Sequence, residues 1–155
     1  MRNSERGRWN SERGRQNSER GTRKAESKAM TDLKLNDRNA PDLKLRTKRF
    51  ALDVIQFVES LPSGETSRVL GRQLLRSGTS VGANYRAAKR AKSTADFISK
   101  MGTVKEEADE SAYWVELLMD SGKVRVGQAG PLLREANELL AISVASINTA
   151  KRKMR

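Results

Sequence analysis

The sequence contains neither cysteine nor histidine. Without cysteine, the chain has no disulfide framework and no thiolate chemistry. Without histidine, it lacks the base of Ser/His/Asp and Cys/His catalytic systems, the common zinc sites and the Glu-x-x-His ligand pairs of di-iron bundles. We therefore expect a protein that is not an enzyme and that uses no metal ion and no cofactor.

Long apolar runs are also missing. No segment approaches the roughly 20 apolar residues of a membrane span, and the polar N-terminus has no apolar signal core. We expect a cytoplasmic protein that does not associate with membranes. With 155 residues and 36% hydrophobic content, the chain is long enough for one domain with a modest core.

The chain is strongly basic. It carries 31 Lys and Arg against 19 Asp and Glu, a formal net charge of +12 that would attract a polyanion such as nucleic acid. Residues 1–49 hold 15 of the basic and 7 of the acidic residues. Much of the excess charge therefore lies outside the expected folded part, so net charge alone does not establish a nucleic-acid partner.

The N-terminal segment is a repeat. "NSERGRW", "NSERGRQ" and "NSERGTR" begin at Asn3, Asn10 and Asn17 and offer almost no apolar residue for a coiled-coil seam. This composition predicts disorder for residues 1–42, a basic repeat and leader. One hypothesis is that the repeat is translated upstream DNA and that Met30 is the natural start. The alternative is a basic RNA-binding arm.

Four amphipathic helical segments follow in residues 43–155. Their apolar residues recur at i, i+3 or i+4 and i+7, and no period-2 strand pattern occurs between turn signals. Ser93 or Thr94 suits the N-cap of the third segment. The expected segments are Leu43–Leu61, Glu65–Ala91, Thr94–Ser121 and a last helix with Pro131 in its first turn. Short connections predict an all-α, antiparallel up-down four-helix bundle.

The stretch "RQLLRSGTSVGANYRAAKRA" (residues 72–91) contains glycines that could suggest a phosphate-binding loop. Such a loop needs a preceding strand and a lysine after its last glycine, and this stretch has neither. On a helical wheel, the core positions Leu70, Leu74, Val81, Tyr85 and Ala88 run straight through it. Gly71, Gly78 and Gly82 form a separate edge, at a cost of about 3 kcal/mol relative to alanine, so we expect a second element to pack closely there.

A third side of this helix carries arginines, which we call the arginine stripe: Arg68, Arg72, Arg76, Arg86 and Arg90. Thr79 and Ala83 fill the gap in its middle. In one interpretation the stripe engages successive phosphates of RNA or DNA with little sequence readout. In the other it is solvated or pairs with carboxylates of the third helix, within the chain or across a subunit boundary. The candidate nucleic-acid-binding residues are Arg68, Arg72, Arg76, Arg86, Lys89, Arg90 and Lys92.

Two aromatic residues lie off the core face of the third helix. Tyr113 and Trp114 are placed alongside Glu110, which suggests a second buried surface. Together with the glycine edge, this favours self-association; alternatively, the leader before Phe50 folds back over the aromatic residues. The candidate residues of a subunit or helix-packing interface are Gly71, Gly78, Gly82, Glu107, Glu110, Tyr113 and Trp114.

The segments "LGRQLLRSGTSVGANYRAAKRAKSTADFISKM" and "EEADESAYWVELL" resemble a bacterial four-helix bundle family first noticed as products of intervening sequences in large-subunit ribosomal RNA genes. Ser80 and Asn84 match the family's Ser-x-x-x-Asn. The acidic positions match at Glu107, Glu110 and Glu116. Where many members continue with Ile-Ala-Glu-Gly, this chain reads Tyr-Arg-Ala-Ala from Tyr85, so one acid is missing and Arg86 is added.

The resemblance implies a small cytoplasmic up-down bundle that forms a homopentamer, with no catalytic residues to carry over. The accessory protein of diversity-generating retroelements is similar to this family. That relative is a basic pentamer that binds nucleic acid and a reverse transcriptase. The resemblance therefore implies a homo-oligomer whose partners are RNA or DNA and a reverse transcriptase or another protein.

Overall fold

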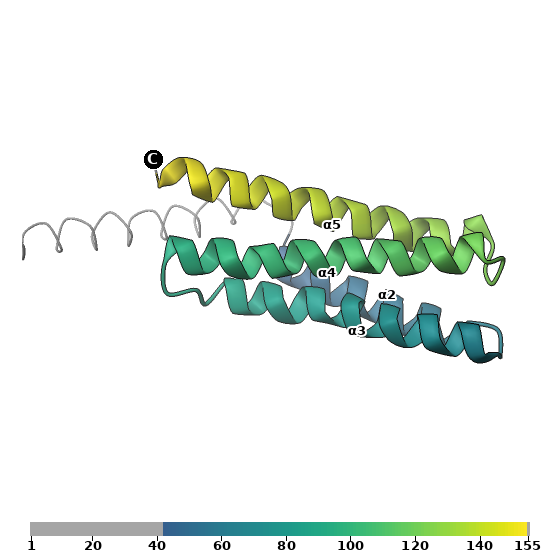
Figure 1. The fold of residues 1–155 in the computed structure, drawn as a ribbon. Coiled ribbons are helices and arrows are strands. Elements are labelled where there is room, and N and C mark those ends of the chain that lie inside the picture. The colour runs from purple at the N-terminus through teal and green to yellow at the C-terminus, as the bar shows by residue number, and fades with distance from the viewer. Residues whose placement is uncertain (1–41, 155) are drawn as a thin grey trace, which may run out of the picture.

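A computed structural model describes residues 42–154 and contains four helices in that range (Figure 1). They are α2 (Leu43–Glu59), α3 (Glu65–Ala88), α4 (Thr94–Asp120) and α5 (Val126–Lys153), and no strand occurs among the described residues. Short connections turn the chain back after each helix, so successive helices lie side by side. The predicted all-α four-helix bundle is confirmed. The expectations for the repeat, the leader and Met30 lie outside the described residues.

Local sequence signals set several helix ends. Asp42 caps α2, because its carboxylate accepts hydrogen bonds from the backbone N–H groups of Lys44 (3.1 Å) and Leu45 (3.3 Å). Ser93 caps α4 by accepting from the N–H of Asp96 at 3.1 Å, as the sequence predicts. After α4, Gly122 adopts a φ of 67°, a left-handed conformation that glycine takes at little cost.

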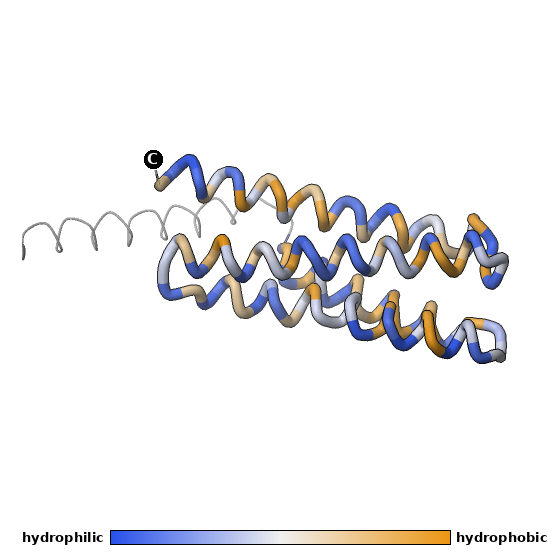
Figure 2. Tube along the Cα trace, in the orientation of Figure 1, coloured by the Kyte–Doolittle hydropathy of each residue, from blue (hydrophilic) through white to orange (hydrophobic). Residues whose placement is uncertain are grey.

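The apolar faces meet in one core. Figure 2 shows hydrophobic residues recurring along each helix between hydrophilic ones. The largest fully buried apolar side chains come from all four helices: Phe50, Val54, Leu74, Val81, Met101, Val104, Val115, Leu118 and Leu139. The predicted core positions of α3 are buried, except that Leu70 is half-buried. No helix in residues 42–154 has the length and hydrophobicity needed to cross a bilayer.

The start of the last helix was predicted wrongly. Pro131 does not lie in the first turn, because α5 begins five residues earlier, at Val126. The turn between Val126 and Pro131 packs into the core through Ala129, which is fully buried. The N–H groups of Gln128 and Ala129 donate to the carbonyl of Arg125. Tertiary packing of this turn thus overrides the local preference of glycine and proline against helix interiors.

The bundle is uneven. The shortest helix is α2, with 17 residues, whereas α5 has 28, and α2 contacts α3 far more extensively than it contacts α5. The α2–α5 side is bridged by the Arg46 guanidinium, which donates from Nε to Glu135 Oε1 (2.7 Å) and from Nη2 to Glu135 Oε2 (2.9 Å) and also pairs with Glu138. The pKa of Arg46 is raised above the ordinary value of an arginine, mainly by the hydrogen bonds to Glu135.

Candidate nucleic-acid interface

The glycine edge of α3 faces α2 of the same chain. A Cβ added to Gly78 would lie 2.7 Å from Cγ2 of Val54, and one added to Gly82 would lie 3.3 Å from the carbonyl oxygen of Thr47. Gly71 would similarly approach Leu61 and Val58. The closely packed element that the glycines predict is therefore α2. Because all three glycines are buried in this contact, they are not exposed on the surface of the bundle.

The arginine stripe runs along the outer side of α3, away from the core, and its last member, Arg90, lies in the turn just after this helix ends. All five of its arginines are exposed, and so is Lys92, whereas Lys89 is half-buried. Since α3 is continuous from Glu65 to Ala88, helix geometry spreads Arg68 to Arg86 over about 27 Å. The stretch that raised the question of a phosphate loop is thus the middle and end of a helix.

The arginines of the stripe differ in whether they form ion pairs with carboxylates. Arg76 forms ion pairs with Glu110 and, at 3.6 Å, with Glu107, both on α4. Arg68 pairs with Glu65 one turn earlier in α3. Within residues 42–154, Arg72, Arg86 and Arg90 form no ion pair. The carboxylate-pairing interpretation therefore applies to Arg76, and three exposed guanidinium groups have no acidic partner in the described part of the chain.

Glu107, which pairs with Arg76, is partly buried, and this burial changes its pKa. Its Oε2 is buried and makes no hydrogen bond, because Arg76 stands just beyond hydrogen-bonding distance. Removal from water raises the pKa of Glu107, and the nearby charge of Arg76 only partly offsets this. The Arg76 guanidinium has a raised pKa, mainly through its hydrogen bond to Glu110. In the described residues, no group of three or more acidic, histidine or cysteine side chains is arranged to hold a metal ion.

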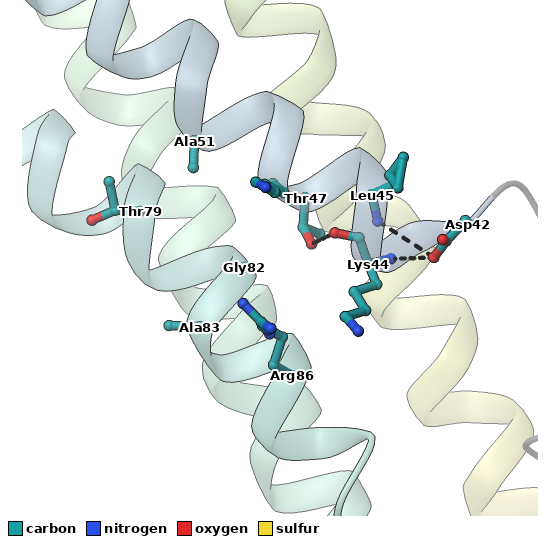
Figure 3. A pocket seen from close by; sticks show the side chains of 10 residues that line it. Asp42, Lys44, Leu45, Thr47, Ala51, Thr79, Gly82, Ala83 and Arg86 are labelled. Atoms are coloured by element: carbon teal, nitrogen blue, oxygen red, sulfur yellow. Dashed lines mark hydrogen bonds between the residues drawn. The ribbon is translucent and has the colours of Figure 1, made fainter.

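Next to the stripe, an open pocket of about 530 Å³ is lined by residues from the start of α2 and the second half of α3 (Figure 3). Its cationic side chains are Lys44 and Lys48 of α2 and Arg86 of α3. The two lysines are not among the candidate residues expected from the sequence. Their i, i+4 spacing on one face of the first helix was a usable signal, but only the fold shows that this face lies opposite Arg86.

The aromatic pair of α4 is split between surface and core, because Tyr113 is exposed whereas Trp114 packs against the edge of the core. Tyr113 is 52% exposed, and its ring packs edge-on against Trp114 with 5.0 Å between centroids. Trp114 is half-buried and donates from Nε1 to Glu110 Oε1 at 3.3 Å. Since Glu110 also binds Arg76, the pair borders the arginine stripe.

The comparisons with known proteins agree with this architecture. Residues 42–145 match the model of the 23S rRNA-intervening sequence protein family. The chain belongs to that family. A solved structure from Bacteroides thetaiotaomicron, described as a protein with unknown function from the S23 ribosomal protein family, is 34% identical to this member, with a TM-score of 0.63. The match covers 67% of this chain and 96% of the other. No curated protein matches the chain.

The Ser-x-x-x-Asn spacing at Ser80 and Asn84 has a local structural role in this chain. Asn84 donates from its side-chain amide to the carbonyl of Ser80 at 3.0 Å, within one turn of α3. Both residues are half-buried. The residues that follow in this chain, Tyr85 and Arg86, point in different directions: Tyr85 is buried in the core, whereas Arg86 lines the pocket.

Proposed function

We propose that this member of the family is a non-enzymatic helical bundle that binds structured RNA or DNA through the arginine stripe of α3. One observation carries the proposal: Arg72 and Arg86 on α3, and Arg90 in the turn just after its end, are exposed and lack an ion-pair partner in residues 42–154. Guanidinium groups bind phosphate oxygens with two parallel hydrogen bonds, which makes unpaired arginines suited to a phosphodiester backbone.

The mode of binding follows from the type of residue. The stripe consists of arginine around small side chains, with no aromatic residue within it, so it suits contacts to phosphates rather than to base edges. Such contacts position a protein on nucleic acid without reading much sequence, and they weaken steeply as salt concentration rises. We therefore expect recognition of shape and charge.

The test is a binding titration with a fluorescently labelled RNA hairpin at several salt concentrations. Arg72→Glu combined with Arg86→Glu should abolish binding and leave the helical circular dichroism and the oligomeric state unchanged. The matched control combines Lys123→Glu with Arg134→Glu, two exposed positions away from α3 with the same change in net charge. Equal binding by the stripe variant and the wild type would refute the proposal.

A second surface supports self-association. Tyr113 and Val69 are large hydrophobic residues about half exposed on neighbouring helices, and Trp114 is only half-buried. Exposed apolar residues of this kind suit a contact between copies of the chain, and a homopentamer is the state that the family resemblance implies. A reverse transcriptase as protein partner rests on that resemblance alone.

Light scattering coupled to size-exclusion chromatography tests the assembly. Tyr113→Glu should convert an oligomer to a monomer without loss of helicity, because its ring is outside the core. Val126→Glu is a suitable control, since Val126 is also exposed but lies at the start of α5 and not on α3 or α4. A monomeric wild type, or an oligomer that tolerates Tyr113→Glu, would overturn the assignment of this surface.

A further inference from the structure

The pocket beside the arginine stripe exists because small residues meet there. Gly82 allows α3 to contact the backbone of Thr47, and Ala51, Thr79 and Ala83 are too short to fill the space above this contact. Figure 3 shows these residues around the opening, with Arg86 and Lys44 extending into it from opposite helices. Thr79 and Ala83, the small residues in the middle of the stripe, therefore line one side of a cleft between α3 and α2.

The charged side chains that line the pocket are mostly cationic. Lys44, Lys48 and Arg86 contribute three cationic groups, and none forms an ion pair with another residue in the range 42–154. The single carboxylate in the lining, Asp42, accepts two backbone hydrogen bonds as the cap of α2. The hydroxyl groups of Thr47 and Thr79 donate to backbone carbonyls one turn earlier, which leaves the cations as the available donors.

We propose that this pocket binds a phosphate group, held between the two lysines of α2 and Arg86 of α3. The fit is chemical: an open cleft lets a tetrahedral anion approach from solvent, and three cationic donors from two helices line that cleft and can contact different oxygens. The phosphate can belong to a nucleic-acid backbone or to a small free phosphate compound. If the phosphate belongs to a nucleic-acid backbone, the inference rests on the proposed function, and the pocket is where one phosphate of the bound strand is held.

Two kinds of variant isolate the pocket from the rest of the stripe. Lys44→Gln combined with Lys48→Gln removes two of its charges without touching α3. Ala83→Leu blocks the cleft without changing any charge, and Ala83 is exposed in the middle of a helix, so leucine should not disturb the core. The matched controls are Lys123→Gln with Arg134→Gln, and Ala141→Leu, all at exposed positions outside the pocket.

In the first arm of the test, the full chain is titrated with the labelled RNA hairpin at increasing salt. Both pocket variants should bind about tenfold more weakly, and the double glutamine variant should lose about one unit of the logarithmic salt slope. The controls should match the wild type. RNA binding that survives both pocket variants but is lost in Arg72→Glu with Arg86→Glu would overturn the RNA anchor and leave the proposed function standing.

In the second arm, the melting temperature is measured with inorganic pyrophosphate and with chloride at equal ionic strength. Stabilisation specific to pyrophosphate, lost in both pocket variants, supports the pocket even if the wild type binds no RNA, in which case only the proposed function fails. If pyrophosphate gives no specific stabilisation and the pocket variants bind RNA like the wild type, the pocket is not a phosphate site.

Discussion

The packing of α2 against the glycine edge of α3 makes a sharp prediction about Gly78. Replacing glycine by alanine inside a helix normally stabilises it by about 1 kcal/mol, because alanine has the higher helix propensity. At Gly78 the added methyl group would lie 2.7 and 2.9 Å from the two Cγ atoms of Val54, which is fully buried. Rotation of this side chain gives little relief, because its Cβ would lie only 3.2 Å from the new methyl group and its β-branched χ1 is stiff in a helix.

Overpacking of a dense core costs about 1–3 kcal/mol, so Gly78→Ala should lower the free energy of unfolding by up to about 2 kcal/mol after its gain in propensity. Gly102 in α4 is the matched control, because nothing lies within 4 Å of a Cβ placed there. Gly102→Ala should therefore raise stability by about 1 kcal/mol. Urea unfolding of the two variants, followed by circular dichroism, measures the difference directly.

A double-mutant cycle then identifies the atom responsible. A Val54→Ala background lacks the two Cγ atoms that make the closest contacts, so Gly78→Ala should cost at least about 1 kcal/mol less there than it does in the wild type. Two results would contradict this prediction: a Gly78→Ala variant as stable as Gly102→Ala, or a cost of Gly78→Ala that is the same in both backgrounds. Either result would mean that α2 does not pack over Gly78 as described.

Two further predictions concern charged side chains. Burial raises the pKa of Glu107, which favours its protonated form in the folded state, so its contribution to stability is present in acid and is lost as the pH rises through that pKa. Glu107→Gln should accordingly be more stable than the wild type near neutral pH, and melting curves across the acid range should show this advantage shrinking as the pH falls. A wild type more stable than the variant at neutral pH would show that pairing with Arg76 outweighs burial. At the α2–α5 contact, Arg46→Ala should lower the free energy of unfolding by about 1 kcal/mol. Arg46→Lys keeps the charge but loses the two parallel hydrogen bonds to Glu135, so its free energy of unfolding should lie between those of the wild type and Arg46→Ala. Urea midpoints that do not change in Arg46→Ala would remove this ion pair from the account of how the bundle closes.

Local patterns in the sequence were sufficient for the fold class. Helical spacing of apolar residues located all four helices, and side-chain chemistry within a few residues narrowed the cap of the third helix to Ser93 or Thr94. The same spacing separated the core, glycine and arginine sides of α3, since a continuous helix fixes the direction of every side chain relative to its neighbours. Those conclusions needed only interactions that are local along the chain.

What the sequence could not determine depends on contacts between distant segments. The extra turn before Pro131 forms because Ala129 is buried against other helices, which no local preference reveals. The partner of the glycine edge is α2 of the same chain, and Arg76 alone in the stripe reaches carboxylates of α4. The cationic pocket likewise appears only once α2 places Lys44 and Lys48 opposite Arg86, because residues some 40 positions apart become neighbours through the packing of helices and not through their spacing in the chain.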